Sequence, residues 1–484
     1  MLAGEDAVRS AGEKYLPRLD SQSDEEFLAY RKRASFFNAT ARSAEGFIGL
    51  VFRRPPFVKV PESQSGVGRA LAAFLNDADM LGTTLPGYAK NVVSEVVGIG
   101  RAGSLIDWSG SEPDEPSVEK RAYVSLYSAE QILNWRIERV NGRNVPTLIV
   151  LSEVLAGLAT GGEGDYFEPQ SQQQIRVLKL VPGENTKDAS GKRPFKYEVE
   201  IWRPKENKRK TAKIEWELVE TKVPLRLGKP LPLIPFVFHG PRHSRPDVDR
   251  PPLSDIIAVN LDHYRLDADY KHGLHFTALP TAWVSGFDKS ASLRIGSSTA
   301  WVSETPGATA GYLEFTGQGL TSFERAMDRD ERLMAVLGSR LLQDQKKVGE
   351  TAEAIRLRQS GEDSALSVIA TSVSESLTQV LRWIYWWNTT LVLPTSDALP
   401  FGLSKAEVTV KLNTDFGIAG MSSQDLQAVV AAWQSGAISR DTMFELFRSG
   451  EILPDGRTNQ DEANLIGSSR ERTQGTQSPT RTGQ

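Results

Sequence analysis

Residues 253–275, LSDIIAVNLDHYRLDADYKHGLH, and residues 321–344, TSFERAMDRDERLMAVLGSRLLQD, are two long helical patterns in one part of the chain. Pro251 and Pro252 come directly before the first pattern, at a point where a helix is expected to begin. The segment between the patterns is rich in Gly, Ser and Thr, and it holds strand-like pieces at 281–285, 300–303 and 312–315. The sequence therefore predicts two long helices that flank a small insert.

A short basic segment follows the second helical pattern. Its residues are Gln345, Lys346, Lys347, Val348, Gly349 and Glu350. One interpretation is an ordinary turn between helices, and the other is a mobile loop whose lysines contact phosphates weakly and reversibly. The pattern after this segment predicts a very long helix over 351–388, with Gly361 as the expected kink.

The chain before residue 253 changes from helical to strand-like patterns. Apolar residues at three- and four-residue spacing predict helices over 24–51, 68–76 and 85–97, followed by a strand at 104–108. From 122 to 238 the apolar period becomes two, which is typical of antiparallel strands. These strands are expected at 123–127, 147–151, 175–180, 197–202 and 214–219, and the Gly- and Gln-rich residues 155–173 are expected to be a mobile insertion.

The end of the chain returns to mixed patterns. A strand is predicted at 407–412, and a helical segment is predicted over 423–450. From residue 467 the chain is rich in Ser, Thr, Gln and Arg and almost free of apolar residues, so disorder is expected there. The predicted fold class is therefore α+β.

Composition excludes several classes of protein. The chain has 484 residues, no cysteine and a formal net charge of -4, so disulfide frameworks, thiolate nucleophiles and Cys-ligated zinc sites are absent. The first residues lack the apolar core of a secretory signal, and no window approaches the roughly 20 apolar residues of a membrane span. The near-neutral charge argues against tight gripping of nucleic acid but allows nucleic acid to slide past.

Gly98, Gly100 and Gly103 form a literal G-x-G-x-x-G pattern. A dinucleotide site needs this pattern after a strand and at the start of a helix, where amides meet the pyrophosphate. Here a predicted helix precedes the glycines and a predicted strand follows them. The favoured interpretation is a glycine-rich turn that lets a helix pack close to a strand, with a nucleotide-binding enzyme as the weaker alternative.

Histidines offer little support for a metal site. His239 and His243 lie in H-G-P-R-H, where Pro and Gly prevent a helix from aligning them. His272 and His275 lie three residues apart near Asp269 and could in principle contact one ion, although polar histidines on a helix face are the commoner case. We expect no metal, no cofactor and no catalytic residues, because no Ser/His/Asp order, nucleophile elbow or phosphate loop is present.

The second long helix carries separate acidic and basic faces. Glu324, Asp328 and Glu331 share one face, and Arg325, Arg329 and Arg332 share the face beside it. The default interpretation is a solvated surface of ion pairs. The alternative is a stripe that faces a channel or a neighbouring subunit.

Four stretches are distinctive as extended patterns. They are GEKYLPRL (12–19), FLAYRKRASFFNATARSAEGFIGLVFRRPP (27–56), VVGIGRAGSLIDW (96–108) and ETAEAIRLRQSGEDSALSVIATSVSESLTQVLRWI (350–384). These stretches resemble one family of portal proteins of tailed bacteriophages, long described as a domain of unknown function. The resemblance extends from about residue 11 to residue 466, excluding the insertion at 155–173. These are extended patterns, and none is a catalytic signature.

The resemblance implies a portal fold with named regions. A β-rich and helical wing would take 1–252, with 407–415 rejoining it. Stem helices at 253–277 and 321–344 would flank a small α/β clip at 278–320, and residues 345–350 would be a channel loop. A long kinked helix at 351–390, a helical crown at 416–466 and a disordered tail at 467–484 would complete the chain.

The resemblance also implies a role without enzymatic activity. About twelve copies would form a ring at one capsid vertex, in a virion assembled in the host cytoplasm. The ring would pass double-stranded DNA during packaging and ejection, and would dock the terminase large subunit, head-tail adaptor proteins and the major capsid or scaffold protein. No membrane partner is expected. Another virion component, from a tail or baseplate, is the alternative within the structural class.

Overall fold

The computed structural model describes most of the chain, and its helices and strands fall into two compact units. The described residues are 1–60, 66–110, 118–140, 142–156, 171–183, 194–205, 215–226, 228–277, 281–287, 301–313, 319–342, 365–388, 408–414, 416, 423–449, 452–453 and 458–474. Unit 1 comprises 1–47, 97–99 and 250–364, and unit 2 comprises 48–96, 100–249 and 365–484. Residues 1–47 thus group with the predicted stem and not with the remainder of the predicted wing.

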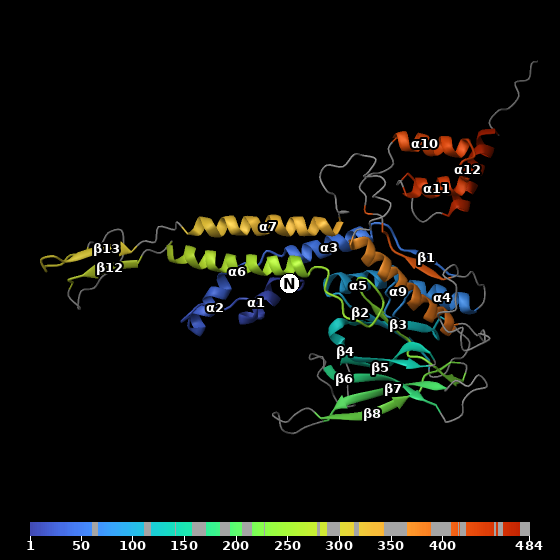
Figure 1. Cartoon of the computed structure of the whole chain (residues 1–484), viewed down its shortest axis with the longest axis horizontal. Coiled ribbons are helices and arrows are strands. Elements are labelled where there is room, and N and C mark those ends of the chain that lie inside the picture. The colour runs from blue at the N-terminus through green and yellow to red at the C-terminus, as the bar shows by residue number, and fades with distance from the viewer. Residues whose placement is uncertain are drawn as a thin grey trace, which may run out of the picture. The chain divides into compact units, whose positions relative to one another are not determined.

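Unit 1 is built around the helix pair α6 (Ser254–Thr277) and α7 (Leu320–Leu342), which lie side by side (Figure 1). Strands β12 (Thr281–Ser285) and β13 (Thr309–Leu313) form an antiparallel hairpin between them in the sequence. The two predicted helices and the first predicted strand of the insert are confirmed. The strand expected at 300–303 is wrong over its described residues 301–303. Of the piece expected at 312–315, the described residues 312 and 313 belong to β13, which begins at Thr309.

The N-terminal helices pack on α6 and enclose the core of unit 1. They are α1 (Glu5–Ser10), the short 3-10 helix Gly12–Lys14, α2 (Asp24–Arg33) and α3 (Ala39–Val51). Apolar side chains of α1 and α2 meet Tyr264 and Ala268 of α6, both fully buried. Ser23 starts α2 with a capping box, because its hydroxyl accepts from the Glu26 amide and Glu26 accepts from the Ser23 amide.

The prediction of one helix over 24–51 is wrong, because the chain leaves helical geometry between α2 and α3. The amide of Ser35 donates to Asp267 of α6 over 2.7 Å, and the amide of Phe36 donates to Glu5 over 3.1 Å. Asn38 then accepts from the amide of Ala41 and starts α3. Carboxylates from distant parts of the sequence therefore replace helical hydrogen bonds at this break.

Unit 2 contains two larger antiparallel sheets. The first has the order β11–β2–β3, and the second is the five-stranded meander β4–β5–β6–β7–β8 (Figure 1). Their strands are β2 (Ala102–Trp108), β3 (Ala122–Ser128), β4 (Ile132–Val140), β5 (Arg143–Ala156), β6 (Ser171–Pro182), β7 (Phe195–Pro204), β8 (Trp216–Lys222) and β11 (Phe236–His239). The predicted antiparallel region is confirmed. Most of the predicted insertion, residues 157–170, lies outside the described residues.

Helix α9 (Ala365–Asn388) packs against the first sheet, and its buried residues include both apolar side chains and several hydroxyl side chains. Its trio Trp383, Trp386 and Trp387 is almost fully buried. Helices α4 (Gly66–Asn76) and α5 (Leu85–Gly98) also belong mainly to unit 2, as does the short 3-10 helix Ala129–Gln131 and the two-stranded pair β9 (Leu225–Arg226) and β10 (Lys229–Pro230). The part of the predicted long helix from 351 to 364, including Gly361, lies outside the described residues.

The late strand β14 (Thr409–Lys411) rejoins unit 2 by pairing antiparallel with β1 (Phe57–Lys59). Its other edge is covered by hydroxyls of α9. Ser374 Oγ accepts from the Leu412 amide, and Thr378 Oγ1 accepts from the Val410 amide, both over 2.9 Å. The helix thus takes the place of a neighbouring strand, which satisfies backbone groups that an edge strand would leave unpaired.

The C-terminal helices are α10 (Ser423–Gln434), α11 (Arg440–Ser449) and α12 (Asn459–Gln474). Gly436 has a φ of 75° between the first two, so the predicted segment 423–450 is two helices joined by a turn. Disorder from residue 467 is wrong as far as Gln474, because α12 continues to that residue. Among the described residues, none of the helices combines the length and apolar composition that a bilayer-crossing segment needs.

Candidate functional site

The antiparallel register of α6 and α7 is defined by three contacts. Tyr270 donates its hydroxyl to Glu324 Oε1 over 2.7 Å, and His263 Nε2 lies 3.5 Å from Glu331 Oε1. A Cβ on Gly273 would lie 2.9 Å from Leu320 Cδ2, so glycine permits close approach of the two helices there. The residue numbers in the first two pairs, 270 with 324 and 263 with 331, both add to 594.

The predicted acidic face of α7 is divided by this register. Glu324 and Glu331 contact α6, and the hydrogen bond to Glu324 raises the pKa of the Tyr270 hydroxyl. Asp328 is exposed. Two of the three carboxylates therefore have contacts within the chain, and whether any of them also lines a channel stays a prediction.

The predicted basic face of α7 lies on its exposed side. Arg329 forms an ion pair with its neighbour Asp330, over 3.2 Å. Arg325 and Arg332 are exposed and form no ion pair with another described residue. Leu333 and Val336, which are 41% and 44% exposed, lie beside them. This side of α7 is thus basic and apolar, and it is uncovered in the single chain.

The predicted channel loop, residues 345–350, lies outside the described residues. The hairpin β12–β13, inside the predicted clip, is described. Its Trp283 and Tyr312 side chains are 45% and 52% exposed. Val302, in the segment that precedes β13, is 81% exposed. Gly311 allows the Trp283 indole to lie across β13, since a Cβ there would be 3.1 Å from Trp283 Nε1.

The histidines have structural contacts. His272 packs edge-on against Tyr30, with ring centroids 5.2 Å apart, and Tyr30 donates to Asp269 over 2.5 Å. Burial together with this hydrogen bond raises the pKa of Tyr30. Within the described ranges, no three His, Asp or Glu side chains gather closely enough to hold a metal ion.

The glycine pattern forms the turn between α5 and β2. The Gly100 amide donates to Val96 O at the end of α5, and Gly100 has a φ of 90°. Gly103, inside β2, lies under Phe236 of β11, where a Cβ would come within 2.2 Å of the ring. The predicted order of helix first and strand second is confirmed, and a packing reason for Gly103 is visible.

Sequence reasoning missed a fully buried chain of hydrogen bonds in unit 2. Tyr88 OH lies 2.6 Å from Ser104 Oγ, Ser104 Oγ lies 2.5 Å from His239 Nε2, and His239 Nδ1 lies 2.7 Å from Ser376 Oγ. Ser376 uses its own proton to donate to Val373 O, over 2.9 Å. It must therefore accept from Nδ1–H of His239, and Nε2 accepts from Ser104, which in turn accepts from Tyr88.

This chain of hydrogen bonds requires a neutral imidazole. Burial lowers the pKa of His239 to about 3, and His239 is 1% exposed. A Ser–His contact of this kind is typical of hydrolases, but a group sealed from solvent has no route to a substrate. Its visible role is to join α5, β2, β11 and α9 through satisfied polar groups.

A half-buried polar cluster joins the two sheets of unit 2. Arg176 Nε lies 2.7 Å from Glu153 Oε1, and Arg176 Nη1 lies 3.5 Å from Asp107 Oδ2. Tyr127 also donates to Glu153, over 2.6 Å. Burial raises the pKa of Asp107, which shares the single guanidinium with Glu153. No sequence signal indicated that these strands would meet.

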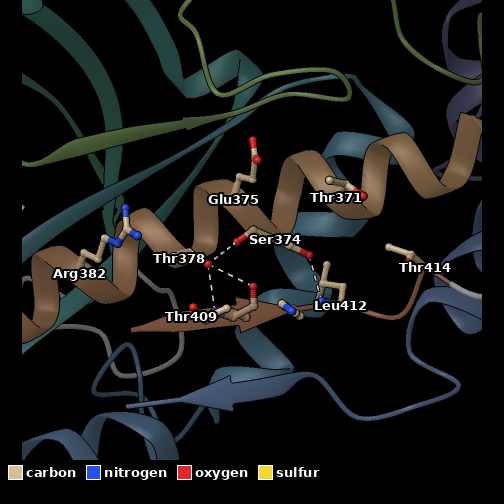
Figure 2. Close-up of a pocket in the computed structure, with 10 residues that line it drawn as sticks. Thr371, Ser374, Glu375, Thr378, Arg382, Thr409, Leu412 and Thr414 are labelled. Carbon is tan, nitrogen blue, oxygen red and sulfur yellow. Dashed lines mark hydrogen bonds between the residues drawn. The ribbon is translucent and has the colours of Figure 1, made fainter. Parts of the chain in front are cut away.

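A cavity of about 290 Å³ lies between α9 and β14. Figure 2 shows Glu375 and Arg382 on one side of α9, and Ser374 and Thr378 in hydrogen bonds toward β14. Arg382 Nε and Nη2 are buried without a hydrogen-bond partner among the described residues. Backbone groups thus occupy the hydroxyls of Ser374 and Thr378, and Glu375, Arg382 and Lys411 give the lining mixed charge.

Comparison with solved structures finds similar chains in gene transfer agent (GTA) particles. A chain from the virion of a native GTA particle has 11% identity and a TM-score of 0.37, and one from the neck of an empty particle has 12% and 0.37. A neck chain of a native particle has 11% and 0.35. Each comparison covers 94% of this chain and 100% of the other. Similarity at this level carries no argument about the fold.

Comparison with curated proteins finds no match. A family model described as a domain of unknown function, DUF4055, matches residues 252–388. That range begins just before α6, includes the hairpin β12–β13 and α7, and ends with α9. The helix pair and its surroundings are therefore the part of this chain that is similar to the family.

Proposed function

We propose that this protein is a phage portal protein, which forms a ring of about twelve copies at one capsid vertex. The observation that carries the proposal is the pair α6 and α7, two long antiparallel helices with a small β-hairpin between them in the sequence. The sequence resemblance to portal proteins includes both flanks of this pair. The return of β14 to pair with β1 agrees with a wing that the chain leaves and rejoins.

In this proposal α6 and α7 are the stem, the hairpin belongs to the clip, and α10 to α12 form the crown. The ring passes double-stranded DNA, docks the terminase large subunit and head-tail adaptor proteins, and contacts the capsid or scaffold protein. This chain performs no covalent chemistry, and ATP hydrolysis belongs to the terminase. The protein is assembled in the host cytoplasm and resides in the virion.

The charge of the chain supports a channel through which DNA slides. Each Lys or Arg that neutralises a phosphate adds salt-dependent affinity, which would slow a moving duplex. The formal net charge is -4 per chain. Lys346 and Lys347 are the proposed loop contacts, because a few reversible contacts can hinder backsliding without holding the DNA.

The ring is tested by native mass spectrometry of the purified protein together with negative-stain images. We expect a closed ring with a central hole and a mass close to twelve times 53.3 kDa. A protein that stays at 53.3 kDa at every concentration contradicts the ring. Nucleotide binding with saturation would then support the enzyme alternative based on Gly98, Gly100 and Gly103.

The channel loop is tested by replacing Lys346 and Lys347 with alanine. We expect normal rings and a several-fold lower amount of DNA retained in heads, because two positive charges per subunit no longer meet phosphates. The measurement is the amount of DNA that each head still contains after the terminase has stopped packaging. Replacing the exposed Lys222 and Lys411 together with alanine is the charge-matched control. Unchanged retention in the double variant removes the loop from the mechanism.

A further inference from the structure

Helix α7 has an uncovered face on the side away from α6. It consists of Arg325, Arg329, Arg332, Leu333 and Val336, all exposed, and the exposed Asp328 borders it. Their spacing of three or four residues places them in one stripe along the helix. Two exposed branched apolar side chains among three arginines are typical of a surface that a protein partner covers.

Helix α6 has an uncovered stripe with two acidic residues, of which Asp255 forms an ion pair with the exposed Arg250. Asp255, Ala258 and Asp262 are exposed, whereas their neighbours Ile256, Asn260 and His263 are buried. Asp262 Oδ1 lies 3.4 Å from Arg265 Nη1, and the Asp262 side chain is still 66% exposed. The two stripes therefore complement each other. On α6 the small Ala258 lies between two acidic residues, and on α7 the bulkier Leu333 and Val336 lie beside arginines.

The register of the helix pair places matching parts of these stripes at the same level. Since contacting residues have numbers that add to 594, Arg332 is level with Asp262, and Val336 is level with Ala258. Arg332 nevertheless forms no ion pair with another described residue. Arg332 and Asp262 therefore form no pair within one chain, although they lie at the same level.

A rotation about a ring axis leaves the height of every residue along that axis unchanged. For helices that run along the axis, residues level within one chain are also level between neighbouring chains. A ring closed by one rotation joins two different surfaces of the subunit. We propose that the α7 stripe of one protomer packs on the α6 stripe of the next, with Arg332 paired to Asp262 and Val336 over Ala258. This inference rests on the proposed ring.

Because the chain contains no cysteine, crosslinking between introduced cysteines tests the contact directly. Purified Ala258→Cys and Val336→Cys single variants are mixed as dissociated protomers, assembled and oxidised. Only contact between chains can then join the two variants. We expect a disulfide-linked heterodimer in up to about half of the chains, because random assembly places the other variant on the required side of a chain half of the time. The matched control mixes Ala258→Cys with Ser322→Cys, also exposed on α7. Position 322 is level with position 272, about 21 Å from position 258 along α6, so no crosslink is expected.

Charge reversal gives a second measurement. Arg332→Asp is expected to raise about tenfold the protomer concentration at which half of the chains are in rings. Adding Asp262→Arg to the same chain restores the pair in swapped form and should bring this concentration back toward the wild-type value. Rescue by the second reversal distinguishes a specific pair from a general effect of charge.

The outcomes separate this inference from the proposed function. Rings with the crosslink between positions 258 and 336 support both. Rings that form without this crosslink, or that crosslink equally at 322, overturn the contact and leave the portal proposal standing. A protein that forms no rings contradicts the portal proposal, and the inference fails with it.

Discussion

Unit 2 is expected to lose about 3 kcal/mol of unfolding free energy through His239 alone between pH 6.5 and pH 4. The folded state holds His239 neutral with a pKa of about 3, whereas the unfolded chain protonates it below about 6.5. The unfolded state therefore binds more protons in this range. The contribution is fully present above pH 6.5 and is lost as the pH falls.

The His239→Leu variant separates this effect from other titrations. At pH 7 it should be less stable than the wild type by about 3 kcal/mol, because Ser104 and Ser376 lose their buried partner. It also lacks the titrating group, so its stability should fall less steeply with acid. The wild type and the variant should become about equally stable near pH 4.

Denaturant unfolding followed by tryptophan fluorescence measures both curves, since Trp383, Trp386 and Trp387 are buried on α9. Thr371→Ala, at an exposed position on the same helix, is the control and should follow the wild type. Parallel curves for the wild type and His239→Leu from pH 7 to pH 4 would show that His239 titrates normally, which contradicts the sealed neutral imidazole.

Local patterns predicted the elements whose apolar period is regular. The strand expected at 281–285 matches β12, and the helix expected at 253–275 differs from α6 by one or two residues at its ends. In these segments the burial of one face follows directly from the spacing of apolar residues. The same spacing continued through the break at 34–38 and predicted one helix where there are two.

Hydrogen bonds between residues far apart in the sequence account for the features that local patterns did not predict. The break after α2 depends on Asp267, which lies 232 residues from Ser35 in the chain. In the same way, Ser104 is 135 residues from His239, and Ser376 is 137 residues from it. Single hydroxyls and carboxylates have no periodic signal, so only the fold shows that they meet.

The division of α7 was only partly predictable. Spacing predicts the acidic residues on one face and the basic ones on the face beside it, because residues three and four apart share a face. It could not show that Glu324 and Glu331 contact Tyr270 and His263, because the rotation of one helix against another is set by packing. The uncovered arginine side of α7 was therefore found from the register.

Gly103→Ala is expected to destabilise unit 2 by about 3 kcal/mol, because the added methyl group would meet a ring that cannot move away. Its Cβ would lie 2.2 Å from Phe236 Cζ and 3.0 Å from Ile132 Cδ1. Phe236 is itself fixed between Tyr127 and Phe238, with ring centroids 6.3 and 4.9 Å away. Denaturant unfolding measures the loss.

Two controls isolate the close approach of Gly103 to Phe236. Gly49→Ala in α3 has no atom within 4 Å of the new Cβ, so it should stabilise the protein by about 0.5–1 kcal/mol through helix propensity. Combining Gly103→Ala with Phe236→Leu removes the ring atoms that clash, and the double variant should be more stable than the sum of the single changes predicts. A Gly103→Ala protein of unchanged stability that loses saturable nucleotide binding would reverse the assignment. The glycines would then serve a ligand, and the turn between α5 and β2 would need a catalytic explanation in place of a packing one.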